Sequence, residues 1–290
     1  MRLGYNTNGL AFHRWSDALE LLADLGYESV AITLDHHCLD PYAEGLAHET
    51  ARMAGLLSRL KLTSVVETGA RFLLNPRLKH EPTLMSASPD ERALRIDFLK
   101  RAVDIACDLG SDAVSFWSGI LREEIPRETA LVRLADGCAE VIDHATAQKM
   151  NLGFEPEPGM FIESFAQFDE LLQQVDASVF GLTIDVGHVH CVEEGPIAGY
   201  LRQWAPRLVN VHIEDMRKGV HEHLRFGEGE IDFRPVMKAL TEIDYTGSVH
   251  VELSRHSHIA PDVARESLEF LQGVLSGSPP LRKGGAGGVG

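Results

Sequence analysis

Four side chains able to bind a metal ion or move a proton stand at the ends of four successive predicted strands in the second half of the chain. These residues are Glu155, Asp185, His212 and Glu252. In a barrel of parallel strands the carboxyl ends of all strands meet at one face, so the four side chains should gather at one depth. Three carboxylates at one barrel mouth would repel one another and raise one another's pKa values unless a cation neutralised them. The pattern therefore predicts a divalent metal site.

The ligand types also bear on the identity of the ion. Three oxygen ligands and one imidazole suit Mn²⁺, Mg²⁺ or Co²⁺ somewhat better than Zn²⁺, which also accepts such ligands. We expect one divalent metal ion at this site. A carboxylate at a strand end can instead cap the following helix, and this explanation fits any one of the acidic residues more readily than the whole set.

Eight β-rich segments alternate with longer amphipathic segments along the chain, as in parallel sheets built from βα units. The predicted strands are 2–6, 29–34, 62–67, 113–117, 152–155, 181–185, 208–212 and 248–253. In the amphipathic segments, the spacing of apolar residues predicts helices at 15–25 before Gly26, at 91–109 before Gly110 and at 127–150. A doubly wound open sheet more often uses five or six strands, so we predict a single (β/α)8 TIM barrel over residues 1–275. The Gly- and Pro-rich segment 276–290 is predicted to be a flexible tail.

The chain resembles the xylose-isomerase-like TIM barrels, which include ketose 3-epimerases, hydroxypyruvate isomerases, inosose dehydratases and the endonuclease IV branch. The resemblance covers nearly the whole folded chain and rests on Glu155, Asp185-x-x-His188, His212-x-x-Asp215-x-Arg217 and Glu252. It implies that Glu155, Asp185, His212 and Glu252 bind the metal ion. It also implies that His188 and Arg217 contact substrate oxygens. These motifs are typical of the superfamily rather than of one reaction.

Glu155 and Glu252 come from strands on opposite sides of the barrel axis, so each can face one side of a bound substrate. A metal ion that chelates a carbonyl and a neighbouring hydroxyl acidifies the carbon between them, because the charge of the resulting enediolate lies on the chelated oxygens. One glutamate can then remove a proton and the other can return it. We therefore predict an isomerase or epimerase of a sugar, a sugar phosphate or a cyclitol ketone, with Glu155 and Glu252 as catalytic residues.

Further candidate substrate contacts lie close to the same strand ends. Besides His188 and Arg217, they are Glu67, Arg71 and Glu157. Glu67 ends the predicted strand 62–67, and Arg71 lies near the start of the segment 68–89 that follows. A connection of this length is predicted to cover the site. Glu157 follows Glu155 in a proline-stiffened segment and is either a substrate contact or an outer partner of the metal ligand. The alternatives are a helix-capping or solvated His188, a surface salt bridge for Arg217 and a solvated loop at 68–89.

Two other histidine pairs suggest additional metal ligands. Asp35-His36-His37 follows the second predicted strand, but a full set of extra ligands of the endonuclease type is not found in the first four strands. His221-x-His223 either returns to the barrel mouth or lies in solvent, and we favour the solvent position.

Composition restricts the other classes of function. The 290 residues are 44% hydrophobic and 24% charged, which is typical of a soluble globular chain, and apolar runs stay well below the roughly 18 residues of a membrane span. The formal net charge of −16 repels polyanions, so the expected partner is a small sugar-like molecule rather than nucleic acid or a membrane. The first residues show no secretion pattern and the four cysteines are scattered, which predicts a cytoplasmic protein with reduced thiols.

Three other functions stay open at this point. A dehydratase of a keto-inositol would begin with the same proton abstraction and then expel a β-hydroxyl. An endonuclease of abasic DNA is disfavoured by the net charge and the missing ligands, and a non-catalytic metal-binding barrel is disfavoured by the intact set of four ligands. The substrate, its phosphorylation, the metal and the formation of a homo-oligomer are also open.

Overall fold

The strands of the sheet consist mostly of apolar residues without the alternation typical of a half-exposed sheet. Strands β2 (Ser29–Thr33) and β6 (Phe180–Asp185) are buried along their whole length. Parallel strands acquire this pattern because helices cover one face of the sheet while the other face lies in the core. In the computed structural model, which describes residues 1–69 and 71–277, these strands form a closed barrel.

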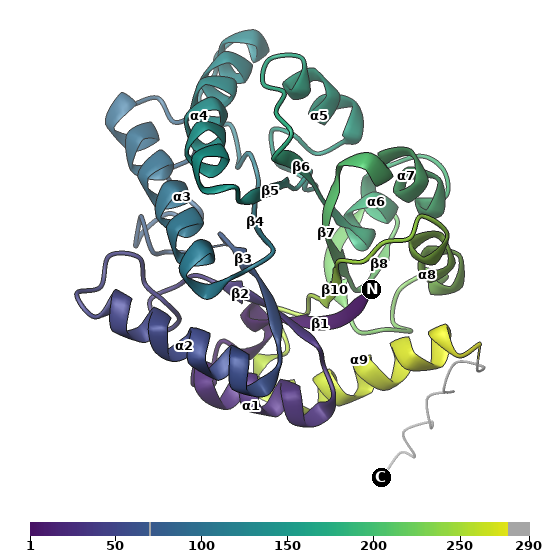
Figure 1. Ribbon diagram of the computed structural model, residues 1–290. Coiled ribbons are helices and arrows are strands. Elements are labelled where there is room, and N and C mark those ends of the chain that lie inside the picture. The colour runs from purple at the N-terminus through teal and green to yellow at the C-terminus, as the bar shows by residue number, and fades with distance from the viewer. Residues whose placement is uncertain (70, 278–290) are drawn as a thin grey trace, which may run out of the picture.

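The barrel has the strand order β1-β10-β7-β6-β5-β4-β3-β2, and β2 pairs with β1 to close it. All neighbouring barrel strands are parallel. The remaining barrel strands are β1 (Arg2–Asn6), β3 (Thr63–Glu67), β4 (Ala113–Phe116), β5 (Asn151–Phe154), β7 (Leu208–Ile213) and β10 (Ser248–Val251). Figure 1 looks along the barrel and shows the helices arranged around the ring of strands. The predicted TIM barrel is confirmed.

The helices pack on the outer face of the ring. They are α1 (Trp15–Leu25), α2 (Leu46–Leu60), α3 (Pro89–Leu109), α4 (Arg127–Gln148), α5 (Phe165–Leu172), α6 (Val186–Val192), α7 (Ile197–Trp204), α8 (Phe233–Glu242) and α9 (Ala260–Leu275). Short 3-10 turns occur at η1 (Thr7–Leu10), η2 (Ala205–Arg207) and η3 (Ser257–Ile259). The three predicted helices correspond to α1, α3 and α4, and α1 ends at Gly26 as expected.

Two features differ from the regular βα alternation. Both α6 and α7 follow β6, and a two-stranded antiparallel hairpin, β8 (Asp215–Arg217) with β9 (Val220–Leu224), is inserted after β7. The hairpin was not predicted, because its short strands are polar and partly exposed and so carry no apolar run. Most of the predicted tail, residues 278–290, lies outside the described part of the chain.

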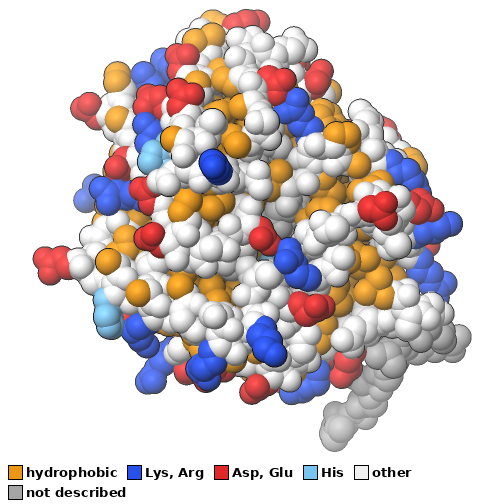
Figure 2. Space-filling model, viewed as in Figure 1, with side chains coloured by type: hydrophobic (Ala, Val, Ile, Leu, Met, Phe, Trp, Pro, Cys, Tyr) orange, Lys and Arg blue, Asp and Glu red, His pale blue; other side chains and the backbone are white. Residues whose placement is uncertain are grey.

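The described residues contain no helix that is both long and apolar enough to cross a membrane. The four cysteines are free thiols, as expected. On the face of the molecule in Figure 2, acidic and basic side chains are interspersed rather than gathered by sign.

A chain of hydrogen bonds crosses the barrel interior beneath the predicted site. His250 on β10 contacts Ser29 Oγ through Nε2 at 2.9 Å and Asn210 Oδ1 through Nδ1 at 3.0 Å. His250 is fully buried, and its ring fits only because β1 carries Gly4 beside it: a Cβ atom there would clash with the His250 ring and lie 3.0 Å from the Ser29 carbonyl oxygen. The interior of the barrel is thus closely packed around a polar chain.

The packing at Gly4 gives a stability test. Gly4→Ala should lower the free energy of unfolding by about 1–3 kcal/mol, because the new methyl group overpacks the His250 ring. The control is Gly55→Ala, since Gly55 lies exposed within α2 and a Cβ atom there meets nothing within 4 Å. Removing a helical glycine at such a place should stabilise the protein by about 0.5–1 kcal/mol. Urea unfolding measures both, and equal effects of the two substitutions would contradict the packing described.

Candidate metal and active site

His212 lies at the centre of the predicted ligand set. Its Nδ1 atom is 3.2 Å from Glu155 Oε1 and 2.9 Å from Glu252 Oε2. With Asp185, these three residues form a group in which one ligand atom from each lies within 4.8 Å of all the others. The structure therefore brings together the four residues that the strand ends predicted.

The sheet itself sets the common depth of these side chains. Asp185, the last residue of β6, stands beside His212 of β7 in the parallel register. The backbone N–H of Glu155 donates to the Phe116 carbonyl at 2.9 Å, and that of Glu252 donates to the Ile213 carbonyl at 3.3 Å. A backbone hydrogen bond to the neighbouring strand thus fixes Glu155 just beyond the end of β5 and Glu252 just beyond the end of β10.

Asp185 has both roles that the sequence suggested for a strand-end carboxylate. Its Oδ1 atom caps α6 by accepting the backbone N–H of His188 at 2.8 Å. Its buried Oδ2 atom has no hydrogen-bond partner among the described residues. An unsatisfied buried carboxylate oxygen costs free energy, and a bound cation would satisfy it. The donor set and this orphaned oxygen fit a divalent metal ion.

Glu67 lies directly behind His212. Its Oε1 atom is 2.9 Å from His212 Nε2 and accepts the Asn210 side-chain amide at 3.1 Å. A carboxylate on the far nitrogen of a ligating histidine fixes the ring and its tautomer, here with Nδ1 turned to Glu155 and Glu252. Glu67 was predicted to contact substrate, and it does line the cavity. Its observed contacts, however, position His212.

Burial and charge shift the ionisation of this group strongly. Burial disfavours a charged imidazole, but the carboxylates of Glu67, Glu155 and Glu252 outweigh it and hold the pKa of His212 well above its usual range. Burial raises the pKa of Glu155 to about 7, although His212 opposes the shift. For Glu252 burial acts in the same direction, but the charge of His212 keeps its pKa below the ordinary value. The pKa values of two similar carboxyls are thus moved in opposite directions, as in acid–base pairs.

A cavity of about 520 Å³ opens at the mouth of the barrel, and Glu155 and Glu252 form part of its lining. Glu67, Arg71, Glu157 and His188 line it, so four of the five predicted substrate contacts face this space. A larger hollow of about 1020 Å³ lies at the opposite end of the barrel, beside the residues that precede the strands. We place the site in the smaller cavity, because the groups of metal-ligand type converge there and catalytic residues of such barrels lie at the carboxyl ends of the strands.

Arg217 does not share this position. It lies on the exposed hairpin, donates to the Glu228 carbonyl at 3.1 Å and is not among the described residues that line the cavity. Its neighbour Asp215 is buried and accepts the backbone N–H groups of Gly227 and Ile231 at 2.8 and 3.1 Å. Asp215 therefore anchors the loop after the hairpin, and the substrate contact of Arg217 stays a prediction.

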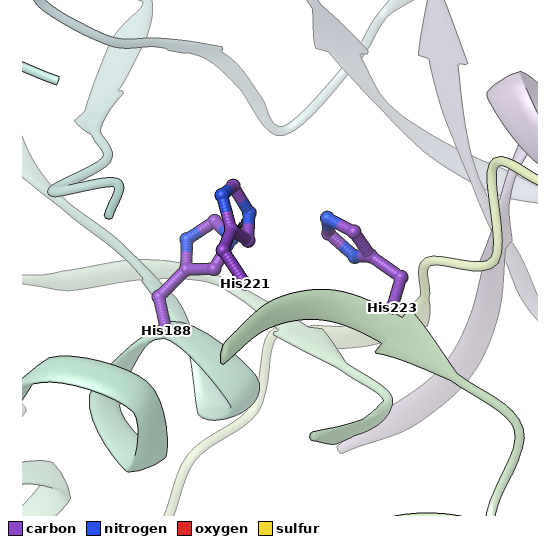
Figure 3. A group of neighbouring side chains, drawn as sticks. All are labelled: His188, His221 and His223. Carbon is purple, nitrogen blue, oxygen red and sulfur yellow. Dashed lines mark hydrogen bonds between the residues drawn. The ribbon is translucent and has the colours of Figure 1, made fainter. Parts of the chain in front are cut away.

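The hairpin brings two unexpected histidines to the cavity. His221 and His223 of β9 face His188 of α6, and Figure 3 shows the three rings clustered together. The solvent position favoured from the sequence for His221-x-His223 is wrong, because β9 folds back over the mouth of the barrel and both residues line the cavity. By contrast, His36 is exposed and pairs with Asp40.

Two further residues of the site carried no sequence signal. Asn8, in η1, donates its side-chain amide to Glu252 Oε1 at 2.7 Å and its carbonyl accepts from Arg71 at 3.2 Å. Glu214 follows His212 by two residues and is completely buried, with Oε1 3.6 Å from His223 Nδ1. It fits only because Gly187 lies opposite: a Cβ atom there would clash with the Glu214 carboxylate. Both residues depend on contacts between distant parts of the chain.

Comparison with known proteins places the chain in a family. Residues 19–274 match the family described as the xylose isomerase-like TIM barrel, and the chain belongs to that family.

Curated relatives include two enzymes named L-ribulose-5-phosphate 3-epimerase UlaE. The one from Escherichia coli is 24% identical over 254 residues, covering 87% of this chain and 86% of the relative. The one from Salmonella paratyphi A is 24% identical over 245 residues, covering 82% of each. The chain thus matches these relatives over most of their length.

Solved structures confirm the fold. A structure of L-ribulose 3-epimerase superimposes with a TM-score of 0.76 at 20% identity, covering 95% of both chains. The IOLI protein, described with a bound zinc atom, gives a TM-score of 0.77 at 20% identity and covers 96% of this chain and 99% of its own.

Glu157 gives a test of the electrostatics of the site. Burial, followed by the charge of Glu155, raises the pKa of Glu157 from an ordinary 4.5 to about 8. Between these values the folded state retains a proton that the unfolded state has lost, so folding stability falls as the pH rises through this window. Glu157→Gln should therefore stabilise the chelator-treated protein by about 4 kcal/mol at pH 8 and change little at pH 4.5.

Urea unfolding at the two pH values measures this difference. The matched control is Glu124→Gln, which alters an exposed carboxyl in the loop after β4 and should have no such pH dependence. An equal effect of Glu157→Gln at pH 4.5 and pH 8 would show that the carboxyl ionises normally.

Proposed function

We propose that this protein is a divalent-metal-dependent isomerase or epimerase of a sugar, a sugar phosphate or a cyclitol ketone. The observation that carries the proposal is the convergence of Glu155 and Glu252 on His212 at the floor of the cavity. Two carboxyls whose pKa values are moved in opposite directions can remove a proton and return it. The relatives named as 3-epimerases, which perform stereochemical inversion at a sugar carbon, support the same class of reaction.

Glu155, Asp185, His212 and Glu252 would hold the metal ion. A divalent ion bound there supplies Lewis-acid polarisation of a ketone and its neighbouring hydroxyl. The three carboxylates favour Mn²⁺, Mg²⁺ or Co²⁺, while the zinc atom of the IOLI structure shows that a relative of the same fold accepts Zn²⁺.

The remaining residues bind and orient the substrate. A cavity of about 520 Å³ is within the range of pockets for small molecules, and polar groups placed around such a pocket fix the orientation of the ligand. Asn8 holds Glu252 through its amide, so the carboxylate that takes the proton has a fixed direction. Arg71 and His188 present nitrogen donors toward hydroxyl oxygens of the substrate, while the ring of Trp117 forms part of the wall.

The glutamate pair provides the central test. Glu155→Gln and Glu252→Gln keep the size of the side chain and one oxygen but lose its basicity, so each should lower turnover by a factor of about 100 or more while retaining part of the metal. The assay follows deuterium uptake from D₂O into a panel of ketoses, ketose phosphates, keto-inositols and hydroxypyruvate, with product analysis. If the two residues serve opposite faces, one variant still exchanges deuterium into the substrate without forming the epimer, and the other does so from the product.

Glu124→Gln, at an exposed site near the same end of the barrel, is the control and should retain full turnover. Elemental analysis of every variant separates loss of metal from loss of acid–base chemistry. Glutamine variants that hold metal and turn over at the wild-type rate would refute the proton-transfer mechanism. A product that has lost water would assign the site to a dehydratase instead.

Arg71 tests the role of the loop 68–89. Arg71 lines the cavity and its guanidinium is tied to the Asn8 carbonyl, so Arg71→Ala should raise KM for the substrate found in the exchange assay by about tenfold and leave metal content unchanged. The control, Arg77→Ala, changes an exposed arginine of the same loop and should have no effect. An unchanged KM for Arg71→Ala would show that this loop does not contact the substrate.

A further inference from the structure

We infer that His188, His221 and His223 form a second metal site, suited to Zn²⁺, beside the carboxylate site. One ring nitrogen from each of the three lies within 4.8 Å of the other two. None of the three belongs to the group made by Glu155, Asp185, His212 and Glu252. The two metal sites thus share no ligand, although the proposed function also uses His188, as a substrate contact.

The distance between the first two histidines fits a common ion. His188 Nε2 and His221 Nε2 are 3.1 Å apart. Two imidazole nitrogens bound to one tetrahedral Zn²⁺ at about 2.0–2.1 Å lie roughly 3.3 Å from each other.

The third histidine is oriented by a buried acid. His223 Nδ1 faces Glu214 Oε1 at 3.6 Å, which leaves Nε2 as the nitrogen available to an ion, and Figure 3 shows this ring turned toward His221. Glu214 is fully buried, and neither of its oxygens has a hydrogen bond to another described residue. A carboxylate behind a ligating histidine is the usual outer partner of a metal site. This arrangement gives the otherwise unexplained Glu214 a role.

The position of the three histidines leaves coordination sites open. All three line the cavity, and three protein ligands with one open position are characteristic of catalytic rather than structural zinc. His188 Nδ1 is 3.4 Å from Glu155 Oε1, so the two sites are neighbours. An ion at the second site would present its open position to the same cavity, where an oxygen of the substrate can bind it.

The test measures Zn²⁺ affinity in chelator-stripped protein by competition with a chromophoric chelator. We expect His221→Ala to weaken one class of Zn²⁺ site by a factor of about 100 or more, since even outer-shell substitutions cost 10–100-fold. The control is Glu222→Ala, which lies between the two histidines on β9, pairs outward with Arg255 and should change neither class. The far-UV circular dichroism spectrum of His221→Ala, compared with that of the unsubstituted protein, shows whether the barrel remains folded.

Cobalt substitution gives a second measurement. Co²⁺ bound by three imidazoles in tetrahedral geometry should give a visible absorption band that His221→Ala removes and Glu222→Ala retains. Because each result is a difference between variants, it does not depend on whether the carboxylate site binds metal. Unchanged Zn²⁺ affinity in His221→Ala would overturn the three-histidine site, including the case in which Asp185, Glu214 and His223 hold an ion instead.

Discussion

Several carboxyls are packed into the mouth of this barrel where little water can screen them. Glu155, Asp185 and Glu252 lie around a single imidazole, that of His212, and its contacts with Glu155 and Glu252 offset only part of their repulsion. The parallel strands force these side chains to one depth, so the repulsion cannot be relieved by moving them apart. The remaining features of the site, from the helix cap on Asp185 to the pairing of His223 with Glu214, are ways of compensating this negative charge.

The fold and the convergence of Glu155, Asp185, His212 and Glu252 were predictable because both depend on local patterns. Each barrel strand is a short β-rich run, and its last polar residue identifies the side chain that reaches the mouth. Asp185 and His212 illustrate this: they end neighbouring strands and stand side by side in the register. Such inferences need only the position of a residue within its own element.

The other residues depend on contacts that the linear sequence does not show. Glu67 also ends a strand, but its contact is with His212, 145 positions away in the sequence. In the sequence, His221 and His223 have the polar neighbours of surface residues, and only the fold of the hairpin over the cavity places them in its lining. Asn8 reaches Glu252 only because the barrel closes between β1 and β10. A hairpin with polar strands shows no periodic spacing of apolar residues in the sequence. A contact made by closure of the barrel shows none either.

The buried hydrogen-bond chain beneath the site has a direction. His250 Nδ1 donates to Asn210 Oδ1, and the amide of Asn210 donates to Glu67, whose carboxylate also faces His212 Nε2. Burial keeps His250 neutral by lowering its pKa. From His250 onward, each hydrogen bond of this chain is therefore donated toward Glu67, whose carboxylate only accepts. Glu67 therefore accepts hydrogen bonds from both sides, from Asn210 in the barrel interior and from His212 at the mouth. Because Glu67 holds Nε2, His212 Nδ1 is left facing Glu155 and Glu252, so the orientation of this ring at the cavity depends on residues packed in the barrel interior.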